Sequence, residues 1–243
     1  MEMFCDREDG GEFDYIYDDR NFKTVNSFGV CNGNANRASS VKYMENCENK
    51  VRIRYINIQG LTKTKIIEVE QLIQSENDVV VLVETQLKHD RIDVSENICK
   101  YDSMRDIEEK RGGGIMILYR NSQNLQMEKK ESTCRDMLTI KMSIYNKDFL
   151  LIIVYFSVIQ KETEETNEKI KREVEKLFEG EEEVIIVGDF NGHINGLGYQ
   201  KQDRNGDMIL EWINNNNMVL LNLDDKCEGN ITWQRNEQKS VID

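Results

Sequence analysis

The sequence predicts an α/β fold in which two sheets pack together and helices cover their outer sides. Strand-like segments alternate with helix-like segments early in the 243-residue chain and again near its centre, which is the pattern of α/β folds. Between these two regions lie two strand-like segments joined by a short turn, and such a hairpin does not occur in a simple parallel sheet. Two packed sheets with outer helices accommodate both observations.

The folded region is expected to begin near residue 50. Residues 1–49 show no apolar periodicity and are rich in Gly, Asn, Asp and Ser, a composition typical of disordered segments. We therefore predict a disordered leader over residues 1–49 and a folded domain over residues 50–243.

The domain opens with a predicted strand, helix and strand. Apolar and basic residues alternate over residues 51–56, as in a half-buried strand. An apolar stripe at helical spacing follows over residues 66–73, with Thr62 or Thr64 as its N-cap. The apolar run 79–83 then indicates a buried strand.

The middle of the chain contains a glycine run and the hairpin. Gly112, Gly113 and Gly114 precede the apolar segment 115–119. Because phosphate-binding glycine loops precede a helix, these glycines indicate a bulge or a close backbone approach instead. Segments 137–144 and 149–155, separated by a turn-like tetrapeptide, form the predicted hairpin.

The last third of the chain repeats the alternation. A charged helix is predicted over residues 163–179 and ends at Gly180. The apolar run 184–187 is a buried strand, and residues 207–215 and 218–221 are a short helix and a further strand.

Polar side chains stand where three of the predicted strands end. They are Asn57, Glu84 and the pair Asp189 and Asn191. Each has a structural interpretation as well, since Asn57 would cap a turn, Glu84 would be an exposed carboxylate and Asp189 would start a turn. Together, carboxylates and amides without a nucleophilic Ser or Cys suit a hard divalent cation such as Mg²⁺. Hydrolysis of a phosphate ester is the chemistry that such a site implies.

Composition narrows the class of protein. The net charge of −13 argues against broad electrostatic binding of nucleic acid, although it leaves room for a local basic groove. The six cysteines form no Cys-x-x-Cys pair, which argues against zinc. We find no signal peptide and no apolar run of the roughly 20 residues that a membrane helix needs, and we expect an intracellular protein without membrane contact.

Six short motifs stand in order over residues 51–243. They are Asn57-Ile58-Gln59-Gly60-Leu61, Val83-Glu84-Thr85, Gly112-Gly113-Gly114-Ile115, Val154-Tyr155, Gly188-Asp189-Phe190-Asn191 and Ser240-Val241-Ile242-Asp243. In this order they resemble the signatures of the endonuclease/exonuclease/phosphatase superfamily. The spacing from Asn205-Gly206-Asp207 to Asn222 is similar to that of the AP-endonuclease-like domains of LINE-type (non-LTR) retrotransposons. The resemblance implies a four-layer α/β/β/α sandwich, the DNase I-like fold.

The resemblance also assigns a role to each matching residue. It implies that Glu84 binds Mg²⁺, with Mn²⁺ as an alternative, and that Asp189 orients or deprotonates the attacking water. Asn57 and Asn191 would hold the scissile phosphate or the nucleophile, and Tyr155 would donate to a phosphate oxygen. The implied partners are duplex DNA, which is nicked, and a reverse transcriptase domain in a longer native protein acting in the nucleus.

Two positions depart from the family pattern. Gln59 stands where AP endonucleases carry an acidic metal ligand, and a neutral amide weakens cation binding. Asp243 matches the family Asp that orients a catalytic His, and the sequence stops on it. Since His89 and His193 stand at no matching position, we expect His193 to be a loop residue. We also expect the last strand to be missing, with solubility and turnover impaired by this C-terminal truncation.

Two other functions remain open. One is a phosphatase of the same superfamily that acts on lipid or inositol phosphates, which the acidic net charge would favour. The other is a non-catalytic remnant, for which the early end of the sequence is the support.

Overall fold

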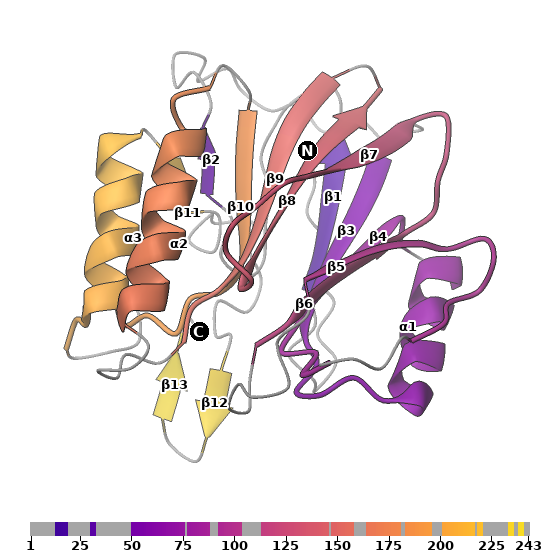
Figure 1. Cartoon of the computed structure of the whole chain (residues 1–243), viewed down its shortest axis with the longest axis horizontal. Helices are drawn as coiled ribbons and strands as arrows, with labels where there is room; N and C mark the ends of the chain where they lie inside the picture. Colours follow the sequence, from indigo (N-terminus) through magenta and orange to yellow (C-terminus); the bar gives the residue numbers. More distant parts are fainter. Residues whose placement is uncertain are drawn as a thin grey trace, which may run out of the picture.

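Two mixed sheets pack face to face, with helices on both outer sides (Figure 1). In the described part of the chain the layers run α/β/β/α: helix α1 (Lys63–Ser75) covers one sheet, and helices α2 (Glu164–Leu177) and α3 (Arg204–Asn215) cover the other. The computed structural model describes residues 13–18, 30–32, 50–75, 77–87, 92–103, 113–145, 147–157, 164–180, 183–195, 201–216, 218–220, 233–235 and 238–240.

The first sheet contains, among the described residues, five strands in the order β1-β3-β4-β6-β5. Strands β3 and β4 are parallel and are joined through α1, while the other neighbours pair antiparallel. The strands are β1 (Phe13–Asp18), β3 (Lys50–Asn57), β4 (Val79–Val83), β5 (Cys99–Ser103) and β6 (Ile115–Tyr119).

The second sheet has the order β11-β2-β10-β9-β8-β7. Here β9 and β10 are parallel and joined through α2, so each sheet holds one parallel pair with its crossover helix on the outside. The strands are β2 (Val30–Asn32), β7 (Leu125–Lys130), β8 (Met137–Ile144), β9 (Lys147–Tyr155), β10 (Glu183–Asp189) and β11 (Met218–Leu220). A separate hairpin pairs β12 (Trp233–Arg235) with β13 (Gln238–Ser240).

Alternation along the strands divides the core into an inner and two outer parts. On β9, Phe149, Leu151, Ile153 and Tyr155 face the other sheet, whereas Leu150, Ile152 and Val154 face the helices. Strand β4 alternates in the same way between the inner core and the α1 side. Strand β4 and residues 149–155 of β9 are buried on both faces, which is why these segments are continuous apolar runs.

Most predicted elements are present at nearly the predicted positions. The hairpin is β8 and β9 in antiparallel register. Thr62 caps α1, since its hydroxyl accepts from the Lys65 amide at 3.2 Å. The glycine run makes the predicted close approach: a Cβ on Gly114 would lie 2.5 Å from Thr85 Oγ1. Gly112 lies outside the described residues.

Three features differ from the sequence expectation. Phe13–Asp18 and Val30–Asn32, placed in the leader, are strands that pair with β3 and β10, because partner strands supply the order that local composition lacks. The boundary at residue 50 stays a prediction. Helix α3 begins at Arg204 rather than 207, because the Asp203 carboxylate caps it by accepting from Gly206 N at 2.8 Å.

Edge strands β5 and β7 have no clear apolar pattern, and the sequence pattern did not indicate them. Every residue of β5 is half-buried, and in β7 only Leu125 is buried. Their strand conformation comes from backbone pairing with β6 and β8. No described helix combines the length and the apolar character needed to span a membrane.

Candidate active site

The polar strand-end residues meet at one end of the two sheets. Asn57 ends β3 and Asp189 ends β10, each in phase with the inward-facing residues of its strand. Asn57 Nδ2 donates to Asp189 Oδ2 at 3.1 Å, across the gap between the sheets. Alternation alone thus directs an amide of one sheet toward a carboxylate of the other.

A second bond between the sheets joins Tyr155 to Glu84. The Tyr155 hydroxyl, at the inner-facing end of β9, donates to Glu84 Oε1 at 2.9 Å. Glu84 follows Val83 directly, and by alternation it would point outward with Leu82 toward α1. Its φ of 53° breaks the alternation, and the carboxylate reaches the other sheet.

Asp189 is a buried carboxylate that accepts several hydrogen bonds. It is 6% exposed, and donors from Asn57 and Asn191 contact its two oxygens. Oδ1 accepts from the Asn191 amide at 3.0 Å and from Asn191 Nδ2 at 2.9 Å, while Oδ2 accepts from Asn57. Asn191 Nδ2 also donates to the Phe156 carbonyl at 2.8 Å, which ties the ends of β9 and β10 together. A buried carboxylate held by several donors is fixed in orientation.

A glycine makes the close approach of β9 and β10 possible. Gly188 has φ 153°, and a Cβ there would lie 1.9 Å from the Val154 carbonyl oxygen. Only glycine fits this position. Gly188 directly precedes Asp189, so packing requires the glycine of the Gly-Asp pair.

The loop after β3 is held from α1. Lys65 Nζ donates to the carbonyls of Ile58 at 2.6 Å and Gly60 at 3.1 Å. Gln59 lies in this loop with φ 46° and is exposed, and its backbone amide donates to Asn57 Oδ1 at 3.3 Å. Among the described residues, no hydrogen bond joins the Gln59 side chain to Glu84.

The remaining predicted residues lie elsewhere or outside the described residues. Asp243 and His89 are outside them. His193, expected to be a loop residue, lies in the loop after β10, and its Nδ1 is 2.8 Å from Asp203 Oδ2. Because Asp203 also caps α3, this pair connects the site loop to that helix. Sequence reasoning missed this partner, because it placed the start of the helix at residue 207 and so did not identify Asp203 as the N-cap.

The donor set suits a hard cation. Glu84 and Asp189 are the carboxylates of the site, with amide oxygens beside them, and Mg²⁺ is usually held by one or two carboxylates and several waters. Among the described residues, no group of three or more His, Cys, Asp or Glu side chains is placed to hold a metal ion. The Tyr155 hydroxyl donates to Oε1 of Glu84.

The four-layer α/β/β/α sandwich defines the fold class of this protein. The fold is the DNase I-like fold of the endonuclease/exonuclease/phosphatase superfamily, as the sequence motifs implied. More particularly, residues 149–243 match a family model described as endonuclease-reverse transcriptase. No curated protein sequence matches the chain significantly.

Several solved structures are similar to this chain. The 3′ phosphatase NExo from Neisseria, bound to a product DNA hairpin, is 14% identical with a TM-score of 0.51 over 67% of this chain and 70% of that one. The AP endonuclease LMAP from Leishmania major is 15% identical, with a TM-score of 0.51 over 68% and 66%. The endonuclease domain of TRAS1, a telomere-specific non-LTR retrotransposon, is 16% identical, with a TM-score of 0.49 over 67% and 69%. The family match and the fold support a hydrolase of the nuclease or phosphodiesterase type.

Proposed function

We propose that this protein is a metal-dependent endonuclease that nicks duplex DNA, as part of a retrotransposon-like element. The observation that carries the proposal is the pair of hydrogen bonds between the sheets, Asn57 to Asp189 and Tyr155 to Glu84. They place two carboxylates, an amide and a hydroxyl at one end of the sandwich. The family description supports a reverse transcriptase as the proposed partner. Nuclear DNA is the proposed substrate, as the motif resemblance implies.

Each residue has a proposed part in the hydrolysis. Asp189 accepts the proton of a water whose oxygen attacks phosphorus. The P–O3′ bond breaks, and the departing O3′ takes a proton from bulk water, which leaves a 3′ hydroxyl and a 5′ phosphate. Asn57 and Asn191 hold Asp189 and the phosphate in orientation. The Tyr155 hydroxyl donates to a phosphate oxygen. A general base of this kind contributes about 10²–10⁴ in rate.

Glu84 is the residue that would hold the cation, Mg²⁺ or alternatively Mn²⁺. Such a cation neutralises charge on the phosphoryl group when bound. Gln59 is the other residue implied by resemblance. Its exposed neutral side chain supports at most a contact through water, so Glu84 carries most of the proposed affinity.

The test is nicking of supercoiled plasmid with Mg²⁺ by the parent chain, Asp189→Asn and Asp78→Asn. Asp78 is the matched control: it is an aspartate that accepts from a backbone amide, Arg52 N at 2.9 Å, at the opposite end of β4. We expect nicking by the parent and by Asp78→Asn, and at least a 10²-fold loss in Asp189→Asn. Equal activity of all three proteins would reject the assigned role of Asp189.

Two further measurements separate the alternatives. Release of inorganic phosphate from inositol phosphates, without plasmid nicking, would favour the phosphatase. When the Mg²⁺ concentration is 100 times the Kd of the parent for Mg²⁺, the unfolding free energy of the parent should rise by about 2.7 kcal/mol. At the same Mg²⁺ concentration the rise should be smaller in Glu84→Gln. If the parent shows no hydrolysis and no stabilisation by Mg²⁺, the protein is a non-catalytic remnant.

A further inference from the structure

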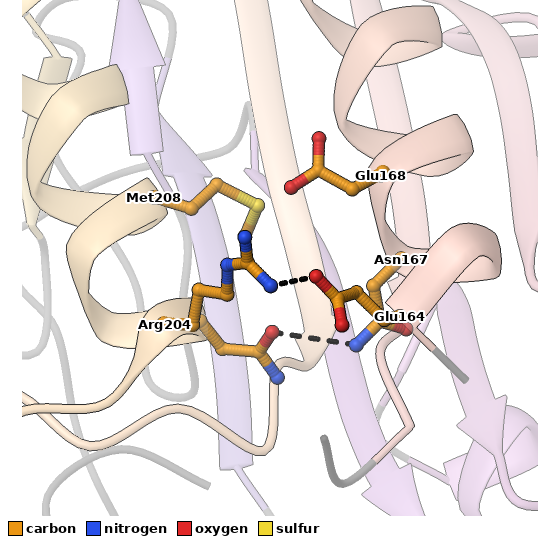
Figure 2. Close-up of a pocket in the computed structure, with 6 residues that line it drawn as sticks. Glu164, Asn167, Glu168, Arg204 and Met208 are labelled. Carbon is orange, nitrogen blue, oxygen red and sulfur yellow. Dashed lines mark hydrogen bonds and ion pairs between the residues drawn. The ribbon is translucent and has the colours of Figure 1, made fainter. Parts of the chain in front are cut away.

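Two buried asparagines face each other between helices α2 and α3. Asn167 is 6% exposed and Asn205 is 3% exposed, although asparagine is mostly a surface residue. They line a small cavity between the starts of the two helices, together with Glu164, Glu168, Arg204 and Met208 (Figure 2). Two of these lining residues, Arg204 and Glu164, form an ion pair (Figure 2). Buried amides at such a place require partners for their donors and acceptors.

Asn205 bonds the backbone of the site loop. Its Nδ2 donates to the Phe190 carbonyl at 2.8 Å and to the Asn191 carbonyl at 3.0 Å. These carbonyls belong to the two residues that follow Asp189. Asn191 has φ 42°, a conformation that non-glycine residues rarely adopt. The side-chain amide of Asn205 therefore donates to the carbonyl of Asn191, which has the unusual φ, and to the carbonyl of Phe190 before it.

Asn167 bonds the segment after β9 in the same manner. Its Nδ2 donates to the Ser157 carbonyl at 2.8 Å, and its Oδ1 accepts from the Ser157 amide at 3.2 Å. Nδ2 also donates to Asn205 Oδ1 at 3.3 Å. Ser157 stands two residues after Tyr155. One amide pair thus connects the segments that leave β9 and β10, which carry Tyr155, Asp189 and Asn191.

We propose that Asn205, supported by Asn167, is a positioning residue for the hydrolysis proposed above. It acts through Asn191: by holding the carbonyls of the loop, it keeps the Asn191 amide and side chain on Asp189 Oδ1. The inference rests on the proposed function. A carboxylate in place of Asn205 has no donor for either carbonyl, so Asn205→Asp keeps the shape and removes the interaction.

Asn77 supplies the matched control. It is fully buried, its Nδ2 donates to the Leu72 carbonyl at 3.3 Å, and it lies at the opposite end of β4 from Glu84. Asn77→Asp places the same charge at a comparably buried amide, remote from the site. Any effect of destabilisation alone should be seen in both variants.

The experiment compares the whole chain with Asn205→Asp and Asn77→Asp in two measurements. The first is hydrogen exchange by NMR at the Asn191 amide, relative to the core amide of Ile152 as a reporter of global unfolding. In Asn205→Asp we expect the Asn191 amide to exchange about fivefold faster or more, beyond any change at Ile152, since at least one hydrogen bond worth about 1 kcal/mol is lost. In Asn77→Asp the two amides should change together.

The second measurement is plasmid nicking with kcat and KM determined separately. Asn205→Asp should lower kcat about 10²-fold with KM nearly unchanged, because misplacement by about 1 Å has that effect, and Asn77→Asp should keep the parent kcat. Unchanged relative exchange at Asn191, or equal kcat in the two variants, would overturn the positioning role. A third outcome is that the parent does not nick DNA while the Asn191 amide still exchanges faster in Asn205→Asp. This outcome would support the role of Asn205 in ordering the loop and reject the endonuclease function.

Discussion

At the scale of single residues, the site is marked by backbone strain. Gln59, Glu84 and Asn191 have φ values of 46°, 53° and 42°. Such conformations cost on the order of 1–3 kcal/mol each and persist where the surroundings over-determine them. Glu84 shows the consequence most clearly, because its left-handed φ turns an outward position into a contact with Tyr155. Strain is therefore part of how the side chains meet.

The Tyr155 hydroxyl is predicted to matter more for turnover than for folding. Tyr155→Phe removes the donor to Glu84 and the proposed donor to phosphate, so kcat in plasmid nicking should fall by about 10²–10³. Its effect on unfolding free energy in urea should be about 1 kcal/mol. Tyr101→Phe is the control, since it removes a hydroxyl that donates to the Met127 carbonyl at 3.1 Å on edge strand β5. A similar loss of kcat in both variants would contradict this prediction.

At the scale of elements, helices hold the loops that carry the site. Lys65 of α1 bonds the loop after β3, and Asn167 and Asn205 bond the segments after β9 and β10. Glu173 of α2 acts similarly on the segment before β8: it accepts from Thr133 N at 3.0 Å, from Thr133 Oγ1 at 2.6 Å and from Cys134 Sγ at 3.1 Å. Helix docking and loop order are therefore coupled.

The Glu173 contacts predict a pH dependence of stability. Burial raises the pKa of Glu173, but hydrogen bonds from Ser132, Thr133 and Cys134 outweigh burial and hold the pKa below 4.5. Since the folded-state pKa is the lower one, the carboxylate stabilises the fold above the unfolded-state pKa, and this contribution is lost as the pH falls through the folded-state pKa. The difference in unfolding free energy between the parent and Glu173→Gln should thus be largest near neutral pH and shrink in acid.

Urea unfolding over a pH series measures this difference. The exposed Glu128 of β7, paired with Lys130 at 3.5 Å, serves as the control. Glu128→Gln should change stability by less than about 0.5 kcal/mol at every pH, as is usual for surface pairs. If the difference in unfolding free energy between the parent and Glu173→Gln does not depend on pH, the hydrogen bonds at this position do not distinguish the carboxylate from the amide.

Burial and Glu173 also raise the pKa of Cys134 to about 11, so this cysteine should remain a thiol near neutral pH.

At the scale of the whole molecule, the site exists only while the two sheets are packed together. The bond from Asn57 to Asp189 joins β3 to β10, and the bond from Tyr155 to Glu84 joins β9 to β4. Each bond has one partner in each sheet. The inner core that separates the sheets therefore sets the spacing of the site, whereas the outer cores under the helices do so only indirectly.

Two neighbouring residues of β9 test this dependence. Ile153 faces the inner core, Ile152 faces the helices, and both are fully buried. Ile153→Val and Ile152→Val should each lower the unfolding free energy by about 0.5–1.5 kcal/mol. Only Ile153→Val should also lower kcat or the stabilisation by Mg²⁺. Equal effects of the two substitutions on activity would mean that the inner core does not control the site.

The apolar pattern and the order of short motifs by themselves determined the fold class and the candidate residues. Buried runs such as 79–83 and 149–155 need two covered faces, which limits the architectures that suit them. The candidate polar residues could be identified in the same way, because each stands close to the point where a predicted strand ends. These properties are local in the chain, and sequence alone contains them.

Tertiary structure alone decided which groups meet. Pairing with β3 and β10 made strands of segments that look unstructured by composition. The left-handed φ of Glu84 reversed the direction that alternation assigns to it. Asn167 and Asn205, 38 residues apart, bond each other between two helices. Each of these outcomes depends on a partner distant in the chain, and no local pattern specifies that partner.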